Sequence, residues 1–314
     1  MSTKEKIMQP FAGRKRRWGD RNDGFLVRNM DPMSKLIPYI MTTMPDSWVL
    51  FEDRIDITHT QEFIRDMRAG EIPGLTLYQV IFAAVVRTIS QVPQINRFEM
   101  NRRIYARNHI KMAMVVKKGM SLAGERTTLM PFFDPEDTLK DVVDKINGEM
   151  DKIDRSVNSV EEDQNKTSFD MLQYVLSGIP NGVMKLVFWL LKKLDKIGLL
   201  PRKLTDLSPF HTTAFITNMG SFGMDAVYHH IYEFGTLSIF GAIGNKEIVY
   251  ETQRDGSVKR KVYLNMKFVA DERITDGYSY GVAFKNIKTH IMKPEKLLTP
   301  PAKVVEDVID PVRK

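Results

Sequence analysis

The chain has 314 residues, of which 43% are hydrophobic, and it carries a formal net charge of +7. A chain of this size can bury a large core. It contains no cysteine, which excludes disulfides, thiolate metal sites and a cysteine nucleophile. It has neither an uncharged apolar run of the roughly 18 residues that a spanning helix needs nor a secretory signal pattern. We therefore expect a cytoplasmic protein.

Positive charge is concentrated at Arg14–Arg17, beside Trp18, in a polar segment that we interpret as a loosely ordered basic arm over residues 1–30. Such a cluster is usually solvated or contacts an acidic neighbouring subunit, and it can also bind an anionic membrane surface. No aromatic ladder, helix-turn-helix spacing or zinc pattern accompanies it, so we do not expect nucleic acid as a partner.

The first half of the remaining chain alternates between helical and strand patterns. Residues 33–44 are apolar and proline-rich, which predicts a short helix or an irregular segment packed on the body. Residues 47–58 have the spacing of a strand, and Thr58 or Thr60 is the predicted cap of the helix that follows. Residues 75–93 are so uniformly apolar that we predict a nearly buried helix.

Two short strands around a polar turn are predicted at residues 102–116, and another strand at 128–134. An amphipathic helix follows, for which Asp137 or Thr138 is the predicted cap. Residues 155–168 contain few large apolar side chains and are predicted to form an exposed linker.

Residues 183–200 are apolar around most of the helical circumference and belong to an apolar helical insertion at about 155–205. Four lysines gather toward one side: Lys185, Lys192, Lys193 and Lys196. The helix is short for spanning a bilayer. One interpretation is packing on the body as a lid over the site. The other is an interfacial helix that contacts a membrane or roofs a long-chain acyl pocket.

The last third is rich in Val, Ile, Phe, Thr and Tyr, which is typical of strands. Strands are predicted at 212–220, 236–244, 247–251 and 259–271, with a hairpin turn at 254–257 and a closing helix at 276–294. We find no internal repeat, so residues 31–314 are predicted to form one α+β domain.

Three stretches carry a family resemblance. ITNMGSFG at 216–223, LSIFGAIG at 237–244 and ADERITDGYSYGVAF at 270–284 resemble, in order and separation, motifs of the acyltransferase cores of 2-oxo acid dehydrogenase complexes. Weaker agreement extends the resemblance to residues 30–300, apart from the insertion. Chloramphenicol acetyltransferase shares the fold of that family.

The resemblance implies a two-layer chloramphenicol acetyltransferase-like domain, a mixed sheet with helices on one face. It also implies a homotrimer with its sites between subunits. Coenzyme A or acyl-CoA would be the substrate, reaching the site from one side while the acyl acceptor enters from the other. No metal is expected.

The family's general base is the histidine of an H-x-x-x-D-G motif, and Glu272 occupies that position here, whereas Asp276 and Gly277 follow the pattern. Thr217 stands where the family places a hydroxyl that stabilises the oxyanion from the neighbouring subunit. Without the resemblance, Thr217 would be an ordinary strand residue and Asp276 a loop residue before a helix.

The altered position leaves three hypotheses, because an ordinary carboxylate is a weak base at neutral pH. Glu272 can be a base tuned by burial, another histidine can replace it, or acyl transfer is lost. His229 and His230 are the secondary candidates for a base. A structural Glu272 would instead pair with an arginine such as Arg273.

No lipoyl domain fits before residue 30, so we expect an acyltransferase that acts without one. Its acceptor would be an acyl carrier, a free small molecule or a lipid. The alternative is a catalytically inactive trimeric scaffold or regulatory homologue. With either function, the chain is expected to be cytoplasmic or peripheral at the membrane surface.

Overall fold

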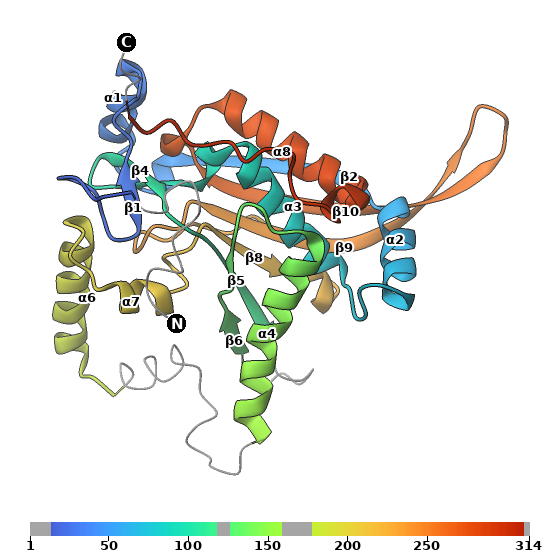
Figure 1. Ribbon diagram of the computed structural model, residues 1–314, viewed down its shortest axis with the longest axis horizontal. Helices are drawn as coiled ribbons and strands as arrows, with labels where there is room; N and C mark the ends of the chain where they lie inside the picture. Colours follow the sequence, from blue (N-terminus) through green and yellow to red (C-terminus); the bar gives the residue numbers. More distant parts are fainter. Residues whose placement is uncertain (1–13, 118–125, 159–177, 311–314) are drawn as a thin grey trace.

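A mixed β-sheet forms the centre of the protein in the computed structural model, which describes residues 14–117, 126–158 and 178–310 (Figure 1). The strands follow the order β2-β10-β9-β8-β5-β6, and β7 pairs beside β5. Their bounds are β2 (Trp48–Asp56), β5 (Ile110–Lys117), β6 (Arg126–Leu129), β7 (Phe132–Phe133), β8 (Ala214–Asn218), β9 (Ile239–Thr252) and β10 (Val258–Asp271). The β5-β8 and β8-β9 pairs are parallel, and the other pairs are antiparallel.

Strands β9 and β10 form a long hairpin that projects from the body (Figure 1). The predicted hairpin turn is confirmed, because the main-chain nitrogen of Gln253 donates to the oxygen of Ser257. The prediction of two separate strands at 236–244 and 247–251 is wrong, since β9 is continuous. The pairing of β9 with β10 shifts register at this point, because Leu264 is opposite Lys246 whereas Met266 is opposite Ile243, as in a β-bulge. The shift interrupts the alternation of side chains, which explains the misleading pattern.

Helices cover one face of this sheet, where α3 (Leu77–Gln91) packs between α8 (Gly277–Met292) and α4 (Leu139–Asn158), with α2 (Thr58–Ala69) nearby. Twelve consecutive residues of α3 are buried. A helix enclosed on several sides needs apolar side chains around its circumference, so the prediction of a nearly buried helix is confirmed.

Loops cover the opposite face, over a smaller apolar cluster. Met44 and Ile231 come from the loops, and Phe215, Phe240 and Val269 come from β8, β9 and β10. The layers are thus a mixed sheet with helices on one face, as expected for an α+β protein.

A second sheet, in the order β1-β4-β3, lies at one end of the molecule. It consists of β1 (Gly24–Leu26), β3 (Arg97–Met100) and β4 (Arg103–Arg107), and α1 (Pro32–Ile40), α6 (Asn181–Lys196) and α7 (Arg202–Leu207) lie near it (Figure 1). Arg21 is only 3% exposed. The expected loose arm over residues 1–30 is therefore wrong for its inner part, where Arg14 already donates to the carboxylate of Asp310 and Arg21 is buried. Residues 1–13 lie outside the described part.

Local capping corrects other expectations. Neither Thr58 nor Thr60 caps α2, because the carboxylate of Asp56 accepts from the main-chain nitrogen of Thr58, while Thr60 donates to the main-chain oxygen of Ile291. At α4, the hydroxyl of Thr138 accepts from the nitrogen of Asp141, so this threonine is the cap.

Two predictions about irregular segments also change. The predicted strand at 128–134 is two short strands, β6 and β7, which lie on either side of Pro131. Part of the predicted linker is helical, because α4 continues to Asn158. The remainder of residues 155–168 lies outside the described part of the chain.

Candidate functional site

Glu272 lies at the end of β10, in a single 3-10 turn, η6 (Glu272–Ile274), that leads toward α8. Its side chain is exposed. Asp276 is the N-cap of α8, and its carboxylate accepts from the main-chain nitrogen of Ser279 at 2.7 Å. The turn therefore presents one carboxylate to solvent and uses the other to start a helix.

A buried ion network holds this turn in place. The guanidinium of Arg273 makes two 2.8 Å hydrogen bonds to the carboxylate of Asp271 and a 3.0 Å ion pair with Glu99 of β3. Burial alone would lower the pKa of Arg273. The hydrogen bonds and charge of Asp271, together with the charge of Glu99, outweigh burial, so the pKa of Arg273 is raised above its ordinary value. The arginine therefore stays a cation and fixes the backbone on both sides of Glu272.

The alternative in which Glu272 pairs with Arg273 is wrong, because Arg273 is occupied by Asp271 and Glu99. Among the described residues, no ion pair or hydrogen bond to the Glu272 carboxylate is present. Its charge is therefore available to a ligand or a neighbouring subunit.

Thr217 is the next-to-last residue of strand β8 and is half-buried, and its hydroxyl makes a weak 4.0 Å contact to the sulfur of Met219. The loop beyond it is tightly packed on β9. A Cβ atom at Gly220 would lie 2.4 Å from the main-chain oxygen of Gly244. The pairing of the two glycine-containing motifs in the sequence thus has a steric cause, since only glycine permits this approach.

Gly220→Ala is expected to reduce the free energy of unfolding by about 1–3 kcal/mol, because the added methyl group must displace main-chain atoms. The matched control is Gly281→Ala in α8, where a Cβ would meet nothing within 4 Å; there we expect a gain of up to about 1 kcal/mol. Urea denaturation measures both variants. Equal stability of the two variants would contradict the close approach of Gly220 and Gly244.

Strand register separates Thr217 from Glu272 within one chain. Thr217 is opposite Ala242, which is opposite Lys267, and Glu272 is five residues further along the chain. This spacing corresponds to about 17 Å along the strands. Within one subunit, the proposed oxyanion donor and the proposed base therefore do not meet.

The two secondary candidates lie on the loop-covered face. The ring of His229 stacks on Phe240 with centroids 4.6 Å apart, and that of His230 lies 6.5 Å from Trp48. Trp48 is opposite Asp271 in the register of β2 and β10. His230 is therefore near the strand end that carries Glu272.

The sequence interpretation missed the supporting residues Asp271, Glu99 and Tyr280. The hydroxyl of Tyr280 donates to the main-chain oxygen of Asp271 at 2.7 Å. The Asp-Glu-Arg triplet at 271–273 could have indicated the first of these contacts, because neighbouring opposite charges often pair. Glu99 gives no local signal.

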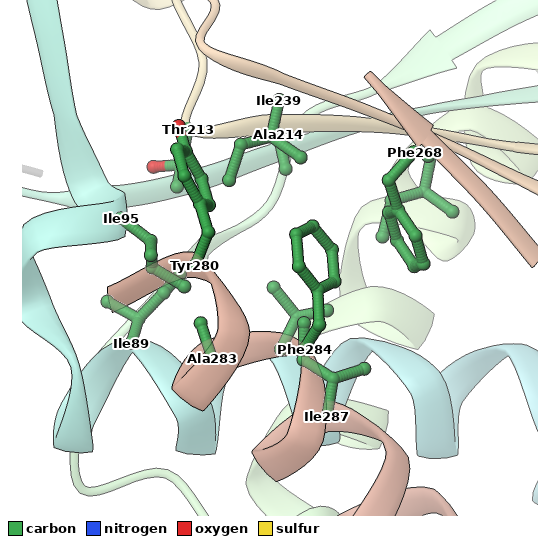
Figure 2. Close-up of a pocket in the computed structure, with 13 residues that line it drawn as sticks. Ile89, Ile95, Thr213, Ala214, Ile239, Phe268, Tyr280, Ala283, Phe284 and Ile287 are labelled. Carbon is green, nitrogen blue, oxygen red and sulfur yellow. The ribbon is translucent and has the colours of Figure 1, made fainter. Parts of the chain in front are cut away.

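A small apolar cavity lies behind the turn, between the sheet and helices α3 and α8 (Figure 2). Its volume of about 20 Å³ is close to what a single water requires. Tyr280, Ala283 and Phe284 of α8 border it together with Phe268 of β10. This cavity is too small for an acyl group.

Residues 203–299 match the family model of the 2-oxoacid dehydrogenases acyltransferase (catalytic domain). A comparison with curated proteins gives no match. Among solved structures, the cubic core of the pyruvate dehydrogenase multienzyme complex is 11% identical, with 86% of this chain and 93% of that chain covered and a TM-score of 0.50.

A probable dihydrolipoamide acetyltransferase from Listeria monocytogenes 4b F2365 is 16% identical over 84% of this chain and 93% of that chain, with a TM-score of 0.49. A chloramphenicol acetyltransferase is 10% identical over 84% of this chain and 97% of that chain, with a TM-score of 0.48. Such identities bear on the fold alone. The chain thus resembles the acyltransferase catalytic cores of 2-oxo acid dehydrogenase complexes, and its match to their catalytic domain includes Thr217, Glu272 and Asp276.

Proposed function

We propose that the protein is a coenzyme A-dependent acyltransferase that works as a homotrimer, with Glu272 as the general base. The observation that supports this most is the buried network of Asp271, Arg273 and Glu99, which holds a turn whose exposed residue is Glu272. A buried ion network is by itself weak evidence for a role in stability, so its position under this carboxylate favours a role in the site.

In the proposed reaction, the carboxylate of Glu272 takes the proton from the thiol or hydroxyl of the acceptor. The acceptor atom attacks the thioester carbonyl of acyl-CoA, and the hydroxyl of Thr217 donates a hydrogen bond to the resulting oxyanion. Collapse of the intermediate breaks the carbon–sulfur bond and releases coenzyme A, whose sulfur receives the proton from Glu272. An acyl carrier, a small molecule and a lipid remain the classes of acceptor.

A homotrimer agrees with the register of the sheet. Because Thr217 and Glu272 lie about 17 Å apart along the strands of one subunit, a shared site needs Thr217 from one subunit and Glu272 from another. Sedimentation of the purified protein is expected to give a trimer.

Acyl-CoA binding and turnover test the proposal directly. Acetyl-CoA and palmitoyl-CoA are titrated by calorimetry, and release of coenzyme A is followed with a thiol reagent. The chain contains no cysteine, so the protein gives no background with this reagent. When dihydrolipoamide is the acyl acceptor, its own thiols react with the reagent, so acyl transfer to it is followed by chromatography instead. If neither acetyl-CoA nor palmitoyl-CoA binds, the proposal is refuted.

Thr217→Val is expected to lower turnover by roughly 10²–10³-fold with acyl-CoA binding unchanged, because the hydrogen bond is made to the developing oxyanion. Thr299→Val, at an exposed position, is the matched control. A rate for the Thr217 variant equal to that of the control would exclude the oxyanion role.

A second candidate function is a catalytically inactive trimeric scaffold or regulatory homologue. It is favoured by one observation, the glutamate at the position where the resemblance implies a histidine base. This candidate predicts a trimer that releases no coenzyme A with any acceptor tested.

A further inference from the structure

Helix α6 is fixed to the body along one side. Its partly buried side chains are Met184, Val187, Leu191 and Leu194. Near its C-terminal end, the carboxylate of Asp195 lies 2.7 Å from the guanidinium of Arg21 and 3.1 Å from the ring of His211. These contacts anchor the helix, so its exposed side is a defined surface.

That exposed side carries an apolar stripe beside the partly buried residues, which we name the outward stripe. It consists of Val183, Leu186 and Leu190 of α6 and Ile197 immediately after it, which are 50%, 63%, 49% and 62% exposed. Their spacing places them along one side of a helix. Apolar side chains that are exposed contiguously indicate an interaction surface. In Figure 1, α6 lies at the edge of the molecule, away from the large sheet.

Positive charge accompanies the outward stripe. Lys185, Lys192, Lys193 and Lys196 are exposed, whereas Asp195, the carboxylate of this helix, is buried. Trp189 is 58% exposed, and the ammonium of Lys193 lies 5.8 Å from its ring centroid. An apolar stripe next to lysines, with a tryptophan at the boundary, is typical of helices that lie in the interface of an anionic membrane.

The basic cluster of the N-terminal segment adds to this charge. Lys15 and Arg16 are exposed, and Trp18 is 88% exposed. The guanidinium of Arg202, at the start of α7, donates to the main-chain oxygen of Asn22 at 3.1 Å. The N-terminal segment therefore lies close to the segment that follows α6.

A spanning orientation does not fit. Within the described residues no helix is both long and apolar enough to cross a bilayer. The 16 residues of α6 measure about 24 Å, less than the roughly 30 Å of a hydrocarbon core. The helix can therefore lie in the membrane plane but cannot cross it.

We propose that the outward stripe of α6 docks on an anionic phospholipid surface. The stripe enters the boundary between headgroups and acyl chains, and the lysines contact the lipid phosphates. The protein is then a peripheral membrane protein, and this holds for either candidate function. Binding is measured without acyl-CoA, so its failure leaves the proposed function intact.

The test is flotation of the purified protein with vesicles at low salt. Phosphatidylcholine vesicles with and without one third phosphatidylglycerol are compared. We expect the protein to float with the anionic vesicles and to remain in the soluble fraction with the neutral ones. Recovery in the soluble fraction with both kinds of vesicle, or equal flotation with both, would overturn the proposal.

Variants locate the contact. Leu186→Gln combined with Leu190→Gln is expected to lower the partition coefficient at least roughly 100-fold, since two leucine side chains lose their burial. Lys185→Gln combined with Lys192→Gln is expected to lower it roughly 30-fold, because each cation contributes a factor of about five. The control combines Ile248→Gln and Tyr250→Gln on the β9–β10 hairpin, which are 52% and 68% exposed.

Sedimentation of the same variants excludes a different occupant of the stripe. We expect the leucine variant to keep the oligomeric state of the wild type while it loses flotation. If instead the assembly dissociates and flotation persists, the stripe is a contact between subunits and the proposal is overturned. Binding of an acidic acyl carrier protein without binding of anionic vesicles would overturn it as well.

Discussion

Glu272→Gln is expected to lower acyl transfer by about 10²–10⁴-fold, because glutamine keeps the shape of the side chain but cannot accept a proton. Acyl-CoA affinity and the melting temperature should stay near the wild-type values. The side chain is exposed and has no ion pair among the described residues, so loss of its charge leaves no buried partner unpaired. Release of coenzyme A, calorimetric titration and thermal melting are measured on the same preparation.

Glu62→Gln is the matched control, since Glu62 is an exposed residue of α2. Its turnover should equal that of the wild type. Undiminished turnover in Glu272→Gln would exclude Glu272 as the base and direct the search to His230, near Trp48, and then to His229.

Glu272→His examines whether the surrounding site still suits a histidine base. The network of Arg273 with Asp271 and Glu99 does not include Glu272, so the substitution should leave the turn folded. A gain of transfer or of acetyl-CoA hydrolysis above the wild-type rate is expected if the remaining groups are positioned for acyl transfer. No activity in wild type or in either variant would favour the inactive scaffold.

Local pattern predicts the stretches over which the environment stays the same. The apolar circumference of α3 and the alternation over residues 261–268 of β10 each follow from one environment that persists over several residues. Prediction of β9 was wrong for a matching reason, because a register shift changes which residues face the core partway along the strand. A pattern averaged over a window of residues does not detect the single extra residue of a β-bulge.

Contacts between distant segments could not be predicted from the sequence. The inner part of the N-terminal segment is polar and basic, and polar composition favours exposure. Its burial depends on carboxylates, one of which, Asp195, belongs to a helix far along the chain. The support of Glu272 by Glu99 of β3 has the same character. The motif predicts where the candidate base lies, whereas the fold determines what holds it.

Asp195→Asn is expected to reduce the free energy of unfolding by about 3–5 kcal/mol, as removal of one member of a buried ion network does. Asp195 is 2% exposed, and its partners Arg21 and His211 are 3% and 1% exposed. Arg21 also bonds Asp23 at 2.8 Å, so one carboxylate would remain for its charge. The ring of His211 would lose a charged acceptor. Urea denaturation at pH 7 measures the loss.

The effect should also depend on pH with a definite sign. Burial alone would raise the pKa of Asp195, but the hydrogen bond and charge of His211, together with Arg21, lower it below its ordinary value. A carboxyl with a lowered folded pKa contributes stability above its unfolded pKa of about 3.9 and loses it as pH falls through the folded value. The difference between wild type and Asp195→Asn should therefore be constant from pH 7 to about 4 and shrink below.

The matched control is Asp144→Asn, which removes an exposed ion pair with Lys140 one helical turn away. Such pairs contribute about 0.5 kcal/mol or less. If Asp195→Asn were no more destabilising than this control, the buried network would not anchor α6. The outward stripe would then lack a fixed support, and a membrane contact would have to depend on the helix alone. A large loss confined to Asp195→Asn instead makes this network the link between the N-terminal segment, α6 and the sheet.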